Sequence, residues 1–430
     1  MKKAVCFVLL LCVAGSVPAA DAPRRLTLRE AEDIALAQHP RIYAATLIAL
    51  AARQSVKESR AGLFPSIYAS ATAVGVADPN NTRISAGYLN NPNVFEREAE
   101  GLTIQQLITD FGRTRDLTQT AKLRSKAEEM NREATREEIL LEVNNSYFSV
   151  LRAKAILVAA RQTENERQVV LGQIQTLANT AKNRTDLDVS FASVDLDQAR
   201  LLVAKADNDL QSAFANLSSV LGGRMPQTFD LAEEPMPASV TNSAPELIVE
   251  ALANRPDLAR LRYQRAAASE FARAETKLSY PTISAMASGG LMPLGDSRLG
   301  DNYAAAGVNL NFPLFAGGFY VARRREASLR AEAADQSVRD QEDMIARDTQ
   351  ISKLNLDYSF GLLDQTARLL QNANRALELA RGRFSNGLSS IVELNQAELN
   401  QINAQIEEAG ARYGIHIQRA ALDFQIGRLR

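Results

Sequence analysis

Alternation of apolar and polar side chains marks two neighbouring stretches in the first half of the chain, the pattern expected of strands with two unlike faces. Over residues 66–76, Ile67 and three alanines fall on one side, and serine, tyrosine and threonine fall on the other. Residues 101–108 alternate in the same way, after a loop at 78–94 that is rich in Asn, Pro and Gly. The pattern predicts a β-hairpin over residues 66–109.

The second half of the chain repeats this arrangement. Residues 282–290 and 303–311 alternate and flank a loop at 292–301. We therefore expect a second β-hairpin within residues 281–313.

Helical patterns surround both hairpins. Helix formers over 27–60 are interrupted at His39–Pro40, which predicts a short helix and then a longer one. After the hairpins, residues 113–179 and 319–385 contain no proline. At 1.5 Å per residue the first would extend roughly 100 Å, far beyond an ordinary globular helix, so a coiled coil is expected.

The helices that follow carry an apolar seam. In the first, steps of three and four residues alternate without a miss, which is the spacing of a coiled-coil interface. Its members are Val189, Ala192, Leu196, Ala199, Val203, Ala206, Leu210, Ala213, Leu217 and Val220. The second helix, over 391–427, has Leu399, Ile402, Ile406, Ala409 and Tyr413 on its seam.

Local sequence also repeats between the halves. Residues 35–42 align with 251–258, and residues 217–222 align with 422–427. Self-similarity of this kind indicates one duplicated unit of about 200 residues. The expected organisation is a signal peptide at 1–20, repeat 1 at 21–221, a linker rich in Gly and Pro at 222–245, and repeat 2 at 246–430.

The first 20 residues combine a basic start, an apolar run and small residues, so we expect a secretory signal cut after Ala19 or Ala20. Cys6 and Cys12, the two cysteines of the chain, lie within it. The mature protein is therefore expected to lack disulfides and thiol chemistry. Leucines directly before Cys12 disfavour lipidation at that cysteine.

Charge and composition argue against several classes of protein. The chain has 49 Lys and Arg and 50 Asp and Glu, for a net charge of −1. It therefore has no excess of positive charge that would attract a nucleic acid. The two histidines, His39 and His416, are far apart, and no phosphate loop, metal-ligand spacing or nucleophile motif occurs. We expect no enzyme, no cofactor and no metal site. The sequence after the signal offers no apolar run long enough for a transmembrane helix.

Two hairpins raise a problem of closure. Four strands cannot close, and an open sheet in lipid leaves unpaired N–H and C=O groups that cost several kcal/mol each. Transmembrane barrels need at least about eight strands. Three copies supply twelve strands and close both layers by cyclic symmetry. The expected fold class is a mixed α/β membrane protein: a long α-helical coiled-coil barrel plus a β-barrel assembled from a trimer, with four strands per protomer and two internal repeats.

Over essentially the whole mature chain, the residues resemble the TolC-like outer-membrane efflux proteins. The most specific match is 251–258, followed by 274–281; 106–113 and 311–318 look like the family's strand-to-helix junctions, and 386–397 looks like its helix-hairpin tip. The resemblance implies a homotrimeric channel in the outer membrane that extends into the periplasm. It further implies the exit duct of a tripartite efflux or type I secretion system, docked with a periplasmic adaptor protein and an inner-membrane pump.

The resemblance also implies two functional regions. Glu393 and Gln396 stand where the family places acidic residues that narrow the periplasmic mouth, and Asp188 is their counterpart in repeat 1. A solvated helix face is the alternative for Glu393, and the amide of Gln396 should weaken any ring that binds cations. The residues expected to contact the adaptor at the tips are Gly387, Leu388, Ser389, Arg184 and Thr185. The first tip, residues 181–188, departs from the family by lacking its usual glycine.

A second class of protein explains part of the pattern. A periplasmic coiled-coil adaptor or scaffold would account for the helices, but not for strands of membrane length in both repeats. Within the channel class, the sequence leaves open whether the substrate is a drug, a metal or a protein.

Overall fold

The computed structural model describes residues 25–74, 97–181, 186–294 and 301–429. The predicted signal peptide and the loop at 78–94 lie outside the described residues. The chain forms two units: residues 1–37, 142–238 and 359–417 belong to the first, and residues 38–141, 239–358 and 418–430 belong to the second.

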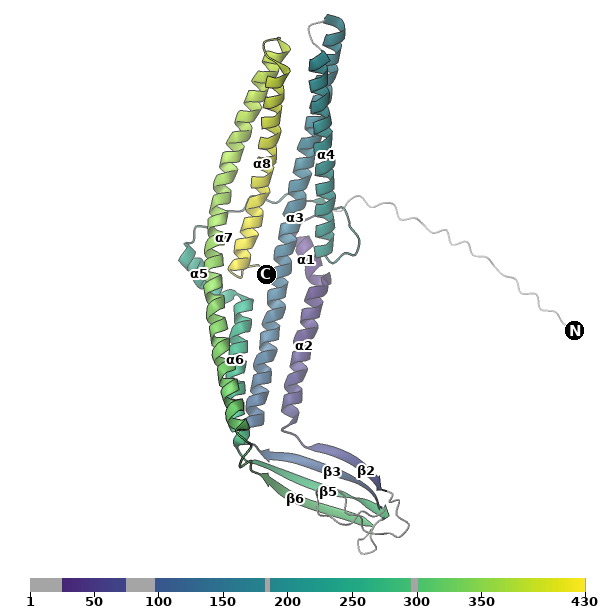
Figure 1. Ribbon diagram of the computed structural model, residues 1–430, viewed down its shortest axis with the longest axis vertical. Coiled ribbons are helices and arrows are strands. Elements are labelled where there is room, and N and C mark those ends of the chain that lie inside the picture. Colours follow the sequence, from purple (N-terminus) through teal and green to yellow (C-terminus); the bar gives the residue numbers. More distant parts are fainter. Residues whose placement is uncertain (1–24, 75–96, 182–185, 295–300, 430) are drawn as a thin grey trace, which may run out of the picture. The chain divides into compact units, whose positions relative to one another are not determined.

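The helices of the first half agree with the predicted pattern. They are α1 (Leu28–Gln38), α2 (Pro40–Ala61), α3 (Arg113–Ala181) and α4 (Asp186–Val220) (Figure 1). The break between α1 and α2 is a helix start, where His39 Nδ1 accepts the backbone N–H of Arg41 at 3.2 Å. Pro40 occupies the first helical position, where its missing N–H is not needed.

The second half has the same order of elements. Its helices are α5 (Ala244–Asn254), α6 (Pro256–Thr276), α7 (Phe319–Ser385) and α8 (Ile391–Gln425), with a short 3₁₀ turn, η1, at Lys277–Ser279. The helices α5 and α6 meet at Arg255–Pro256, as α1 and α2 meet at His39–Pro40. Among the described residues, no helix is both long and apolar enough to cross a membrane.

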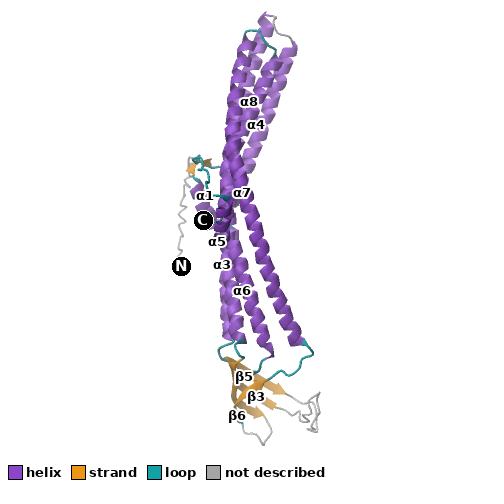
Figure 2. Cartoon of the chain, turned by 90° about the vertical axis from the view of Figure 1, so that its left-hand side faces the viewer, coloured by secondary structure: helices purple, strands orange, loops and turns teal. Residues whose placement is uncertain are grey.

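Four antiparallel strands form one sheet in the order β2-β3-β5-β6 (Figure 1). Figure 2 shows strands of this sheet in orange. The strands are β2 (Ser66–Val74), β3 (Arg97–Thr109), β5 (Thr282–Leu294) and β6 (Asn302–Asn311). The predicted loop at 292–301 began too early, because β5 continues to Leu294 and Met292 donates its backbone N–H to Asp301 O at 2.7 Å.

The register confirms that the sheet has two unlike faces. Directly paired residues share a face, and one row across all four strands is Ile67, Ile104, Ala287 and Ala306. The next row, on the opposite face, is Tyr68, Thr103, Ser288 and Ala305. We call the face that contains Ala306 the apolar face and the face that contains Ser288 the polar face. Large apolar side chains such as Ile67 and Leu310 are exposed on the apolar face.

Tyr303 covers the polar face next to the last β5–β6 pair, Leu291 and Asn302. A Cβ placed on Gly101 would lie 2.2 Å from the Tyr303 hydroxyl oxygen. Gly290, between these two residues in the row, would bring a Cβ within 2.0 Å of Glu100 O. Glycine is therefore required at both positions for this close approach.

The two strand-to-helix junctions have the same backbone conformation. Phe111 and Gly112 have φ angles of 58° and 88°, and Gly317 and Gly318 have 58° and 85°. At the first junction Asp110 orders the turn, because its carboxylate accepts the backbone N–H groups of Gly112 at 3.0 Å and Thr114 at 2.6 Å. A bulky residue thus adopts at Phe111 the left-handed conformation that glycine adopts in the second repeat.

A buried carboxylate ties three helices together in the second unit. Glu275, near the end of α6, is 2% exposed. Arg113 of α3 approaches it to 3.3 Å and Arg323 of α7 approaches it to 2.8 Å. Because two guanidinium groups share this carboxylate, the buried charge is compensated from both long helices.

In the first unit, the helical seam of α4 is buried as predicted. Six of its ten members are buried, and the other four, including Val189, are half-buried. The second seam needs one correction: Leu399 is 45% exposed, whereas its neighbour Glu398 is buried. Arg167 and Arg381 both form ion pairs with Glu398. These two positive charges compensate the buried carboxylate, which explains why Glu398 and not Leu399 lies in the core.

A small parallel sheet completes the first unit. It joins β1 (Arg25–Leu26) to β4 (Asp230–Leu231). The buried Tyr147 hydroxyl lies 2.9 Å from Leu26 O and 2.7 Å from Ala232 O, so it fastens this sheet to α3. Burial raises the pKa of Tyr147, and the hydroxyl remains a proton donor at neutral pH.

Candidate functional site

The α7–α8 tip is a closed turn built around Gly387. This residue has φ +72°, in the left-handed region that favours glycine. The backbone N–H of Leu388 donates to Arg383 O at 2.8 Å, and the N–H of Gly387 donates to Phe384 O at 3.0 Å. This pair of bonds is the Schellman motif, which satisfies carbonyl groups at the end of α7.

The next helix begins directly after the turn. Ser390 Oγ accepts the backbone N–H of Glu393 at 3.4 Å, and its carbonyl accepts the N–H of Leu394 at the same distance. Ser390 is therefore the N-cap of α8. Its position fixes Glu393 in the first turn of the helix.

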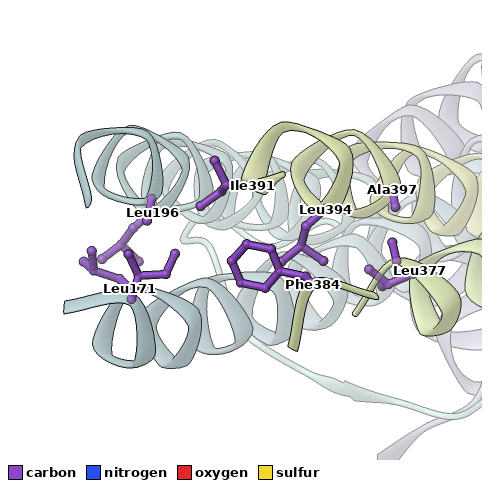
Figure 3. Close-up of a cluster of buried hydrophobic side chains, with 10 residues drawn as sticks. Leu171, Leu196, Leu377, Phe384, Ile391, Leu394 and Ala397 are labelled. Atoms are coloured by element: carbon purple, nitrogen blue, oxygen red, sulfur yellow. The ribbon is translucent and has the colours of Figure 1, made fainter. Parts of the chain in front are cut away.

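An apolar cluster supports the tip from below. Figure 3 shows Phe384 and Leu377 of α7 together with Leu171 of α3 and Leu196 of α4. Ile391, Leu394 and Ala397 contribute the α8 side. Four helices thus hold the turn on one shared core, so the tip residues occupy defined positions.

Two of the predicted constriction residues, Glu393 and Gln396, lie on exposed surface near this turn. Glu393 Oε1 lies 3.3 Å from Arg383 Nε in an ion pair across the turn. Gln396 donates to the Asn400 side chain at 3.0 Å. Asp188 lies in the first turn of α4, where a carboxylate is favourable. The structure brings Glu393 and Gln396 onto one stretch of α8, and Asp188 belongs to the other hairpin.

The predicted adaptor-contact residues differ in their surroundings. Leu388 is 70% exposed at the apex of the turn. Ser389 Oγ is buried and has no hydrogen-bond partner within the described part of the chain. Arg184 and Thr185 lie outside the described residues. Leu388 is thus an apolar side chain that the second tip exposes, as is Val392 in the first turn of α8.

A groove of about 1430 Å³ lies between α3 and α7 beside the tip. Val169 and Leu177 line one wall, and Phe384 and Leu394 line part of the other. Gly172 and Gly382 also border it, and a Cβ on Gly172 would meet nothing within 4 Å. Packing inside the protomer therefore does not explain why this helix position is glycine.

A charged cluster that the sequence patterns did not predict lies behind the tip. Arg167 of α3 and Glu398 of α8 are buried, with Arg167 Nε 3.7 Å from Glu398 Oε2. Arg381 of α7 lies 3.6 Å from the other carboxylate oxygen and also pairs with Glu166. Arg167 donates to the backbone O of Asp195 in α4 at 2.6 Å. The cluster thereby includes all four helices.

Burial raises the pKa of Glu398, and the two arginines oppose that shift. Burial likewise raises the pKa of the Asp195 carboxyl, opposed by Arg167. The sequence shows that these charged residues lie on the helices. The heptad spacing of one helix does not show which charged residues of other helices they contact. Within the described residues, no group of three or more metal-ligating side chains is present.

Comparison with known proteins gives a consistent result. The sequence model of the family described as "outer membrane efflux protein" matches residues 32–223 and 247–428, well over half of the chain. The outer membrane protein TolC of Salmonella enteritidis is 22% identical over 396 residues, covering 88% of this chain and 77% of that protein. OprJ of Pseudomonas aeruginosa is 27% identical over 387 residues, covering 87% and 79%.

Solved structures share the fold. A membrane protein from Pseudomonas aeruginosa superposes with a TM-score of 0.81 at 22% identity, covering 93% of both chains. The outer-membrane channel OprN superposes with a TM-score of 0.80 at 20% identity, covering 93% of this chain and 89% of OprN. The chain therefore belongs to the outer membrane efflux protein family, whose TolC-like members are transport channels of the outer membrane that extend into the periplasm.

Proposed function

We propose that three copies of the chain form the exit duct of a tripartite efflux or type I secretion system, which conducts substrate passively from a periplasmic adaptor and an inner-membrane pump. The observation that carries this proposal is the four-stranded sheet with one apolar face and one polar face, whose edge strands β2 and β6 pair with no further strand among the described residues. Lipid tolerates no open edge, so the edges must be paired by other copies.

The dimensions of the sheet support a membrane location. On β6 the apolar face runs from Ala304 to Leu310, which is roughly 20 Å at about 3.3 Å per residue. Outer-membrane barrels carry an apolar band of about 25 Å. The band ends at Asn302 on β6 and at Glu100 on β3, where polar side chains return to the same face. Three sheets would supply the twelve strands of the proposed β-barrel, with the apolar face toward lipid.

The proposed organisation has two repeats, at 21–221 and 246–430, joined by a linker at 222–245. The two segments matched by the family model and the doubled order of helices and strands support it. In the trimer, the seams of α4 and α8 and the long helices α3 and α7 would form the coiled-coil barrel. The buried seam of α4 supports that arrangement.

The proposed constriction is formed by Glu393 and Gln396 of each protomer, with Asp188 from the first tip. Their support is the matched tip sequence and the position of Glu393 beside a fixed turn. Threefold symmetry would bring three copies of each side chain around one axis.

The proposed adaptor contact consists of Gly387, Leu388 and Ser389 of the second tip, with Arg184 and Thr185 of the first. An exposed leucine on a rigid turn is suited to an apolar contact with a partner. The adjacent groove, with glycines on its border, leaves room for a partner helix to approach closely.

The test has two readouts. Light scattering of the protein in mild detergent, corrected for bound detergent, should give a trimer, and the same sample should form ion-conducting channels in planar bilayers. A monodisperse monomer, or extraction without detergent, would exclude the trimeric duct and favour a periplasmic scaffold. Copurification of an adaptor that is lost on changing the tip residues would support the tripartite assembly.

A further inference from the structure

Arg383 links three parts of the α7–α8 tip. It lies in the last turn of α7. Its Nη2 donates to Leu388 O in the turn at 3.3 Å, and its Nε lies 3.3 Å from the Glu393 carboxylate in α8. One guanidinium thus contacts both the turn and the proposed constriction.

This geometry determines the charge at the mouth. The Arg383 guanidinium lies 3.3 Å from the Glu393 carboxylate. If Glu393 lines the mouth, Arg383 therefore lies at the mouth as well. Gln396 adds no charge, so Arg383 cancels the charge of Glu393 in each protomer, and Asp188 of the first tip is left out of this pair. We infer that Arg383 is a selectivity-determining residue that neutralises the ring of Glu393 carboxylates at the constriction. This inference rests on the proposed function, because it requires Glu393 to line the pore.

The position equivalent to Arg383 is not an arginine in the first repeat. The spacing that relates Asp188 to Glu393 places Ala178 where the second repeat has Arg383. The equivalent positions of the duplicated unit therefore differ in charge between the two repeats.

The exposure of the Arg383–Glu393 ion pair indicates that Arg383 affects the charge at the mouth more than it affects the stability of the fold. The Arg383 and Glu393 side chains are 58% and 45% exposed, and ion pairs at such exposure contribute little to folding. Leu388 O also remains free to bind water at this surface. Loss of the guanidinium should therefore leave the trimer assembled and change only the field in the mouth.

The experiment measures reversal potentials in planar bilayers under a KCl gradient. Arg383→Gln should raise the ratio of K⁺ to Cl⁻ permeability roughly threefold at about 0.1 M salt, where the screening length is about 10 Å. The increase should shrink at about 1 M salt, where that length falls to about 3 Å. Arg383→Lys keeps the charge and should retain the wild-type ratio.

Arg368→Gln is the matched control. It removes an arginine from an exposed ion pair on the same helix, with Asp364. Fifteen residues separate it from Arg383, or roughly 22 Å along α7. The permeability ratio of this variant should equal that of the wild type.

The outcomes separate the inference from the proposed function. If Glu393→Gln shifts the ratio toward anions but Arg383→Gln leaves it unchanged, the inference is wrong and the constriction stands. If Glu393→Gln has no effect, alone or combined with Arg383→Gln, Glu393 does not line the pore and the proposed constriction fails. Should Arg383→Gln not assemble, the exchanged pair Arg383→Glu with Glu393→Arg decides: a wild-type ratio supports the inference, and a changed ratio overturns it.

Discussion

Replacing Ala306 with lysine tests which face of the sheet meets lipid. Ala306 lies near the middle of the apolar band on β6, and its row continues through Ala287, Ile104 and Ile67. Its neighbour Ala305 is the same residue type and is also exposed, but it lies on the polar face, paired with Ser288. The two alanines therefore form a matched pair of sites.

The expected cost follows from depth in the membrane. A lysine on the lipid face near the midplane destabilises a barrel by about 2–4 kcal/mol. Since a trimer carries three copies, Ala306→Lys should cost roughly 6–12 kcal/mol per trimer, three times that range. Ala305→Lys should cost little, because its ammonium group would reach water in the lumen. Leu310→Lys should behave like Ala306→Lys, with a smaller cost nearer the edge of the band.

Ala71 lies on the same apolar face but is a weaker test. Its partner across the strand pair is Glu100, so a lysine there would gain an opposite charge. For Ala306→Lys, the assay compares the denaturant midpoint of the detergent-solubilised trimer and the amount recovered in the outer membrane. Equal effects of Ala306→Lys and Ala305→Lys would refute the assignment of the two faces.

Three further changes test the tip and its core. Gly387→Ala should lower the free energy of unfolding by about 1–2 kcal/mol because of its φ of +72°, measured by denaturant melts; no loss would show that the turn relaxes. Leu388→Asp should weaken adaptor binding at least about tenfold while the trimer persists, and unchanged affinity by surface plasmon resonance would remove Leu388 from the contact. Burial raises the pKa of Glu398 above its ordinary 4.5, so the folded protein holds that proton more tightly than the unfolded chain. As the pH rises above 4.5, stability should therefore fall more in the wild type than in Glu398→Gln, and parallel melting curves would contradict this.

Elements with strong periodicity were predictable. The bounds of α7 agree with the sequence pattern, since no proline interrupts residues 319–385 and Gly387 follows shortly after the end of the helix. The alternating stretches gave the correct faces, and β2 and β3 lie within the predicted hairpin. These features depend on local spacing, which a sequence shows directly.

Contacts between distant segments were not predictable. Glu398 displaces Leu399 from the core because Arg167 and Arg381 meet it from two other helices, and no period in α8 encodes those partners. Arg383 reaches Glu393 across a turn, ten residues away, and this pairing depends on how the turn closes. The left-handed conformation of Phe111 was also unexpected, because such a bulky residue rarely adopts it.

The two unpaired edges of the sheet have a consequence for how the protein is made. In the part of the chain that the structure describes, β2 and β6 are the edge strands of the sheet and its apolar face is exposed, and these are the features of an aggregation-prone surface. If three copies close the barrel as proposed, that surface is covered only when two more copies arrive, so assembly and insertion should occur together. Biogenesis then depends on the meeting of three chains, and the yield of channels should fall more steeply than expression as synthesis is reduced. Periplasmic chaperones that shield sheet edges would matter most when the chain is scarce.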